Sequence, residues 1–125
     1  IGAQMALKDK QVINIAGEAA NGLVVATPWF GEKDDPKVKE FNEKYEKEYG
    51  KLPDQFAAQA YDALYIYAEA LKKAGGEDRD AFRDALAETK NFEGILGEFS
   101  FDEEGDVIMS PTVLEIQNGK FVVYE

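Results

Sequence analysis

One segment dominates the hydrophobic pattern of the chain: residues 53–76 predict a single long helix. Asp54 is a favoured N-cap, and Gly75 offers a left-handed cap at the far end. Between residues 56 and 71 only three positions are polar, and at 100° per residue they form a narrow stripe: Gln59, Asp62 and Glu69. We therefore predict a helix that is buried on most of its circumference and that depends on partners to cover it.

Two amphipathic helices flank this segment. Asp35 is a favoured N-cap, and Pro36 suits the first helical position after it. Gly50 marks the end of this helix. Its apolar stripe consists of Val38, Phe41 and Tyr45, extended by Tyr49. The pattern after the central helix predicts a further helix over residues 77–90.

The remaining segments predict strands and one short helix. Residues 8–20 carry apolar positions at helical spacing, and residues 23–27 form a β-branched run that suits a strand buried on both faces of a parallel sheet. Residues 1–4 are typical of the end of a strand. From residue 91 the period changes to two, and Asn118-Gly119 predicts a hairpin between residues 112–117 and 120–124.

Length and charge limit the possible partners. A chain of 125 residues has the size of one domain, and its formal net charge of -11 opposes binding to nucleic acid or to an anionic membrane. No apolar run is long enough for a membrane helix. Because the sequence begins at Ile1 without a methionine, we expect a processed or excised product whose targeting signal is not included.

The absence of cysteine and histidine argues against catalysis, because it removes thiolate nucleophiles, imidazole bases and the usual zinc ligands. The acidic run at residues 102–106 lacks the twelve-residue spacing of a calcium loop, so we interpret it as a hairpin turn with solvated acids. We expect no metal, no cofactor and no enzyme activity. A self-contained α/β enzyme of this size is the weakest of the alternatives.

Aromatic residues offer the clearest candidates for a ligand site. Trp29 directly follows the predicted strand at residues 23–27, and strand ends in parallel α/β sheets line ligand crevices. A simple packing role for Trp29 is equally consistent with this position. Tyr61, Tyr65 and Tyr67 on the central helix favour a core over a ligand cage.

Three segments together resemble a known family. They are NIAGEAANGLVVATPWF at residues 14–30, DQFAAQAYDA at 54–63 and FEGILGEFSFDEEGD at 92–106. Their order and spacing resemble the C-terminal part of the branched-chain amino acid (Leu/Ile/Val) binding proteins, type I periplasmic solute-binding proteins of ABC transporters. The resemblance covers nearly the whole chain.

The resemblance implies an α/β fold, namely a fragment of a two-lobed binding protein. We expect parallel strands, three to four helices and a C-terminal antiparallel hairpin, with neither lobe complete. The implied division places residues 1–27 in the second lobe, 28–35 in a hinge crossover, 36–92 among the helices of the first lobe, 93–97 in another crossover and 98–125 back in the second lobe.

The family's ligand residues carry over to few positions. Phe56 matches an aromatic residue that packs on the ligand side chain, and Gln55 beside it would face the cleft between the lobes. The acidic residue that often pairs with the ligand's ammonium would fall near Gln4 and Met5. Because a neutral amide cannot pair with an ammonium charge, either the local alignment is offset or the ligand is not a standard α-amino acid. Trp29 completes the set of candidate residues.

The function implied by the resemblance is that of the extracytoplasmic binding component of an ABC importer. Its partners would be a small, amino acid-like ligand and a membrane permease, and its location would be periplasmic or extracellular, with a lipid anchor as an open option. We expect this chain on its own to self-associate. A ligand-sensing domain of the same fold, not coupled to transport, is the alternative function.

Overall fold

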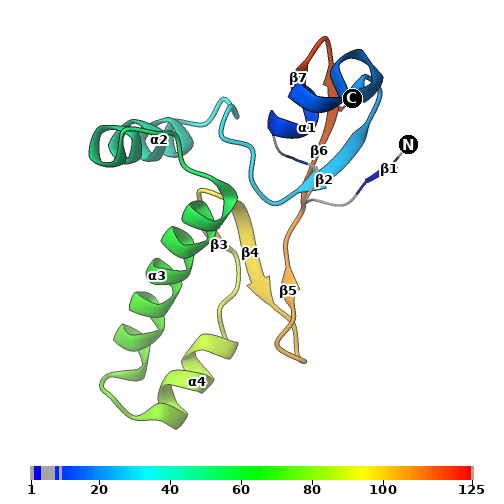
Figure 1. Cartoon of the computed structure of the whole chain (residues 1–125). Coiled ribbons are helices and arrows are strands. Elements are labelled where there is room, and N and C mark those ends of the chain that lie inside the picture. The colour runs from blue at the N-terminus through cyan, green and yellow to red at the C-terminus, as the bar shows by residue number, and fades with distance from the viewer. Residues whose placement is uncertain (1, 4–7, 9, 125) are drawn as a thin grey trace. The chain divides into compact units, whose positions relative to one another are not determined.

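The computed structural model describes residues 2–3, 8 and 10–124 (Figure 1). Its contacts divide the chain into two compact units. Residues 1–28 and 111–125 form one, here called the sheet unit, and residues 29–110 form the other, here called the helical unit.

The sheet unit is built on a four-stranded sheet with the order β1-β2-β6-β7 (Figure 1). Strand β1 (Gly2–Ala3) is parallel to β2 (Val24–Thr27), and β2, β6 (Thr112–Gln117) and β7 (Lys120–Val123) are antiparallel to one another in turn. The helices α1 (Lys10–Ala16) and η2 (Gly17–Ala20) lie between β1 and β2 in the chain. Asn118 and Gly119 both have positive φ, so the predicted Asn-Gly hairpin is confirmed.

Strand β2 differs from its prediction. It is parallel to β1 as expected, but it is buried on only one face: Val25 and Thr27 are buried and Ala26 between them is exposed. The expectation of burial on both faces was wrong because successive side chains of a strand point to opposite faces, and the described part of the chain covers one of them.

Three helices and a small antiparallel sheet form the helical unit (Figure 1). The helices are α2 (Pro36–Tyr49), α3 (Gln55–Ala74) and α4 (Arg79–Ala87). The strands are β3 (Phe92–Gly94), β4 (Gly97–Phe101) and β5 (Val107–Ile108), paired in that order. Each helix starts at an aspartate whose carboxylate accepts a backbone N–H of the first turn, at 2.8 to 2.9 Å: Asp35, Asp54 and Asp78.

The core of the helical unit is a cluster in which α2, α3 and the β3–β4 turn meet. Its buried members are Trp29, Val38, Phe41, Ala58 and Ile95. Phe41 is central among the rings, with its centroid 5.9 Å from that of Trp29, 5.8 Å from Tyr45 and 4.7 Å from Tyr61. The helix stripe predicted for residues 38–45 therefore contributes Val38 and Phe41 to this core, and Tyr45 packs against it.

Helix α3 has its predicted ends but not its predicted buried face. The buried residues recur every four positions: Ala58, Asp62, Ile66 and Ala70. Large apolar residues elsewhere on the helix are exposed: Phe56, Leu64, Tyr65, Tyr67 and Leu71. The stripe that we interpreted as polar thus includes a buried position, Asp62, because this carboxylate finds backbone donors in a segment more than thirty residues further on.

The chain passes between the two units at two points. It leaves the sheet unit after Pro28 and returns to it after Ser110, because β3, β4 and β5 pair with one another in the helical unit. The expected hinge crossovers at residues 28–35 and 93–97 stay predictions. The assignment of these units to two lobes stays a prediction.

Within the described residues, no helix has both the length and the apolar character needed to cross a membrane.

Candidate functional site

The first turn of α3 presents the main candidate residue, Phe56. Its side chain is 69% exposed, and Gln55 before it is half-buried. Asp54 caps the turn by accepting the amide of Ala57 at 2.9 Å. The first amides of a helix have no partner inside the helix and carry partial positive charge, so a carboxylate is favoured at such an end. The turn therefore offers an exposed ring next to backbone donors.

Trp29, the second aromatic candidate, lies in the core. Only 3% of its surface is exposed, and its ring meets Phe41 edge-on at 5.9 Å. This geometry gives Trp29 a packing role in the helical unit, whereas its role towards a ligand stays a prediction. Gln4 and Met5 lie outside the described residues.

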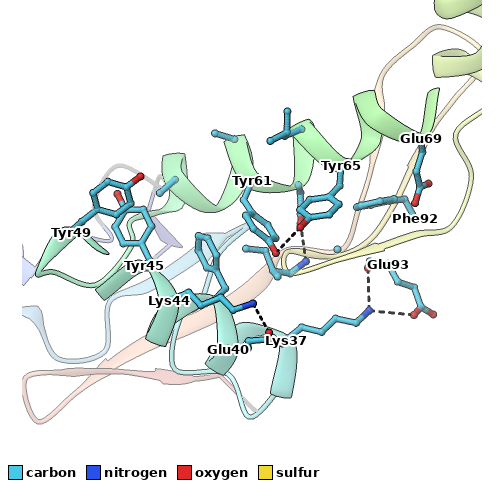
Figure 2. Close-up of a pocket in the computed structure, with 17 residues that line it drawn as sticks. Lys37, Glu40, Lys44, Tyr45, Tyr49, Tyr61, Tyr65, Glu69, Phe92 and Glu93 are labelled. Atoms are coloured by element: carbon cyan, nitrogen blue, oxygen red, sulfur yellow. Dashed lines mark hydrogen bonds and ion pairs between the residues drawn. The ribbon is translucent and has the colours of Figure 1, made fainter. Parts of the chain in front are cut away.

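A groove of about 880 Å³ runs between α2, α3 and β3 (Figure 2). Pairs of tilted aromatic rings line it: the centroids of Tyr45 and Tyr49 are 4.5 Å apart with the planes at 47°, and those of Tyr61 and Tyr65 are 4.9 Å apart with the planes at 51°. Tyr65 is half exposed here, so the prediction of a core tyrosine fits Tyr61 better than Tyr65. The groove combines aromatic walls with charged residues at its edges.

The Tyr61 phenol is held as a neutral donor. Its hydroxyl donates to the Tyr65 hydroxyl at 3.4 Å, and this hydrogen bond together with burial raises the pKa of Tyr61 to about 12. Two lysines on the groove have acidic partners. The Lys37 ammonium donates to the Glu93 carbonyl at 3.1 Å and lies 3.6 Å from the Glu93 carboxylate, and Lys44 donates to the Glu40 carboxylate at 2.6 Å (Figure 2). The groove therefore offers no unpaired lysine charge at these two positions.

Asp62 is the residue that sequence reasoning missed. It is 6% exposed, and its two carboxylate oxygens accept the amides of Ile95 at 3.0 Å and Leu96 at 2.9 Å. Burial raises the pKa of Asp62 above its usual range, against the two amide hydrogen bonds and the charge of Lys37, which lower it. No local sequence signal distinguishes this aspartate from one on a solvated helix face.

The acidic run at residues 102–106 forms the turn between β4 and β5. The Asp102 carboxylate accepts the amides of Glu104 at 2.9 Å and Asp106 at 2.8 Å, so it stabilises the turn itself. Among the residues that the structure describes, no group of three or more acidic side chains could hold a metal ion.

Comparisons with known proteins place this geometry in a family. A model of the family described as periplasmic binding protein matches residues 1–120. The leucine-, isoleucine-, valine-, threonine- and alanine-binding protein of Pseudomonas aeruginosa is 30% identical over 117 residues, which is 94% of this chain and 28% of that protein. The chain thus spans less than a third of the length of this curated relative.

Two solved structures match almost the whole chain. A leucine-binding protein of Thermotoga maritima is 33% identical with a TM-score of 0.81, over 100% of this chain and 36% of that one. The substrate-binding protein of a branched-chain amino acid transporter from Streptococcus pneumoniae, solved with isoleucine, is 28% identical with a TM-score of 0.78. This match covers 97% of this chain and 35% of that one. The predicted α/β fold class is confirmed by these matches. The chain therefore belongs to the periplasmic binding protein family, as its resemblance to branched-chain amino acid binding proteins indicated.

Proposed function

We propose that this chain is part of an extracytoplasmic solute-binding protein of an ABC importer, which binds a branched-chain amino acid or a similar small apolar acid between two lobes. The observation that carries the proposal is the end-to-end match to such proteins, whose structures are nearly three times as long as this chain. The partners would be the ligand and a membrane permease, and the location periplasmic or extracellular.

In this proposal the helical unit belongs to the first lobe and the sheet unit to the second. We move the return to the second lobe from residue 98 to residue 111, in line with the compact units. Phe56 would pack on the ligand side chain, with Gln55 beside it, because the resemblance places a ligand-contacting aromatic residue at this position and the ring is exposed. Gln4 and Met5 would lie near the ligand ammonium.

Replacing Phe56 by alanine in the full-length protein that carries this chain should weaken ligand binding by roughly 10- to 100-fold. The reason is that burying a phenylalanine side chain contributes about 1.5 to 3 kcal/mol. Titration calorimetry with leucine, isoleucine, valine and small aliphatic acids measures the effect. Val107→Ala, at an exposed apolar position on β5, is the control and should leave binding unchanged.

Two results would contradict this proposal. Absence of binding across the whole panel by a folded protein would remove the solute-binding function. Equal affinity of the Phe56→Ala variant and the parent would keep the function but remove Phe56 from the site. Binding by a protein that engages no permease would favour the sensing alternative.

We also propose that the isolated chain self-associates through the exposed side of α3. Leu64, Tyr67 and Leu71 are each 47 to 67% exposed and follow one another at helical spacing. Sedimentation velocity should show species larger than the 13.9 kDa monomer. Because a net charge of -11 repels a second copy, added salt should increase the larger species by screening.

A pair of charged substitutions tests which surface is used. Leu64→Lys combined with Leu71→Lys should restore a monomer, because burying two ammonium groups at the contact is unfavourable. Ile108→Lys, at an exposed position of β5, should leave the association intact. A parent chain that sediments as a monomer at all salt concentrations would disprove self-association.

A further inference from the structure

One end of the tyrosine-lined groove brings together two aromatic rings and a carboxylate. Tyr65 and Glu69 lie four positions apart on α3, so their side chains project from the same face of the helix. Both line the groove together with Phe92 of β3, and Figure 2 shows the Glu69 carboxylate at the same end of the groove as the rings of Tyr65 and Phe92. One small molecule in this part of the groove can therefore contact all three side chains.

The charges of the groove leave Glu69 uncompensated. Lys37 lies 3.6 Å from the Glu93 carboxylate, and Lys44 donates to the Glu40 carboxylate at 2.6 Å, so each lysine of the groove already has an acidic partner. Glu69 is exposed and forms no hydrogen bond or ion pair with the residues that the structure describes. This end of the groove therefore has a free carboxylate that a bound cation would balance.

The size and walls of the groove fit a small organic molecule. Its volume of about 880 Å³ falls within the range of roughly 300–1,000 Å³ that small-molecule sites occupy. Among its tyrosine rings, Tyr49 is 63% exposed and Tyr65 is 50% exposed. Because the face of an aromatic ring carries negative partial charge, exposed rings beside a carboxylate attract cations and disfavour anions.

We propose that Tyr65, Glu69 and Phe92 form a binding site for a small organic cation with an alkylated ammonium group. The two rings contact the alkyl groups and attract the positive charge, and the Glu69 carboxylate balances that charge. An alkylated ammonium fits this site better than a bare ammonium, because a bare ammonium is strongly hydrated and offers no apolar surface to the rings.

This cation site differs from the candidate solute site at the start of α3. Phe56 is not among the side chains that line the groove. Tyr65 follows Phe56 by nine residues, which corresponds to about 13 Å along the helix axis. All three residues of the cation site belong to the helical unit. The inference is therefore independent of the proposed transport function.

Titration of the 125-residue chain with choline, followed by nuclear magnetic resonance, tests the proposal. Because cation–π contacts and ion pairs are weak at exposed positions, we expect a dissociation constant of about 1–10 mM. The side-chain signals of Tyr65, Glu69 and Phe92 should shift together. The neutral alcohol in which carbon replaces the choline nitrogen has the same shape without the charge, so it should bind about tenfold more weakly.

Three results of this titration would overturn the proposal. The first is equal affinity for choline and its neutral analogue, because the groove would then select apolar surface and not charge. The second is a set of shifts confined to residues outside the groove. The third is the absence of any shift at choline concentrations well above the expected range.

Substitutions at exposed positions test the site and leave the core intact. Tyr65→Leu removes a ring and Glu69→Gln removes a charge, and each should weaken choline binding by about two- to fivefold. Tyr65→Phe keeps the ring and should bind choline with the affinity of the parent. The matched control combines Tyr124→Leu, at a tyrosine that is 52% exposed, with Glu77→Gln, both outside the groove lining. An equal loss of affinity in this control would attribute the binding to overall charge and contradict the site.

Discussion

Replacing Gly94 by alanine is expected to destabilise the helical unit by about 2–4 kcal/mol. The added Cβ atom overlaps the Asp62 carboxyl group, so the carboxylate must leave the amides of Ile95 and Leu96 or the strand must move. Each buried donor left without an acceptor costs about 1–3 kcal/mol. Urea unfolding measures the loss, and the fluorescence of Trp29, the only tryptophan, reports it from the core of the same unit.

A double-mutant cycle shows whether the loss comes from this contact. Asp62→Ala alone should cost a similar amount, because it leaves the same two amides unpaired. In the Asp62→Ala background Gly94→Ala should cost little, since the space is then empty. Costs that add in full would contradict the overlap. Gly76→Ala is the control, because no atom lies within 4 Å of a Cβ at that position.

The local signals of the sequence predicted the helices well. Asp35 and Asp54 cap α2 and α3 as expected, and Gly50 and Gly75 end these helices with left-handed φ angles of 70° and 72°. The hairpin at Asn118-Gly119 is equally local. Such features depend on a few neighbouring residues, so the chain specifies them without knowledge of the tertiary structure.

The buried face of α3 could not be predicted in the same way. Counting polar residues placed Asp62 on the stripe least suited to burial, and it is among the most buried residues of the helix. Its burial depends on two amides of a turn that follows more than thirty residues later, and on a glycine there. Long-range partners of this kind decide which face of an apolar helix is covered, and periodicity contains no information about them.

The candidate ligand-binding residues stay predictions, and their sources differ from residue to residue. The exposed ring of Phe56 at the start of α3 came from the resemblance to the family, not from composition or spacing. The position of Trp29 after a strand was equally consistent with ligand contact and with a packing role. Only the structure shows that Trp29 is buried against Phe41. The tyrosine-lined groove joins α2, α3 and β3, so it appears only when these elements come together.

Replacing Trp29 by alanine should destabilise the helical unit by about 3–5 kcal/mol, because it removes a large buried ring that packs on Phe41 and Val38. Trp29→Phe keeps most of the apolar volume and should cost less than half as much. Urea unfolding followed by far-ultraviolet circular dichroism measures both variants. Phe30→Leu, at the neighbouring half-buried position, serves as a control with a cost of about 1 kcal/mol.

The Trp29→Phe variant also distinguishes a packing role of Trp29 from direct contact with the ligand. If Trp29 acts through the core, Trp29→Phe in the full-length protein binds the solute with the affinity of the parent, because Trp29 is only 3% exposed and presents little surface to a ligand. If Trp29 forms part of the ligand crevice, Trp29→Phe weakens binding by more than its loss of stability explains. We expect the first result, and a large loss of affinity in a stable Trp29→Phe variant would contradict it.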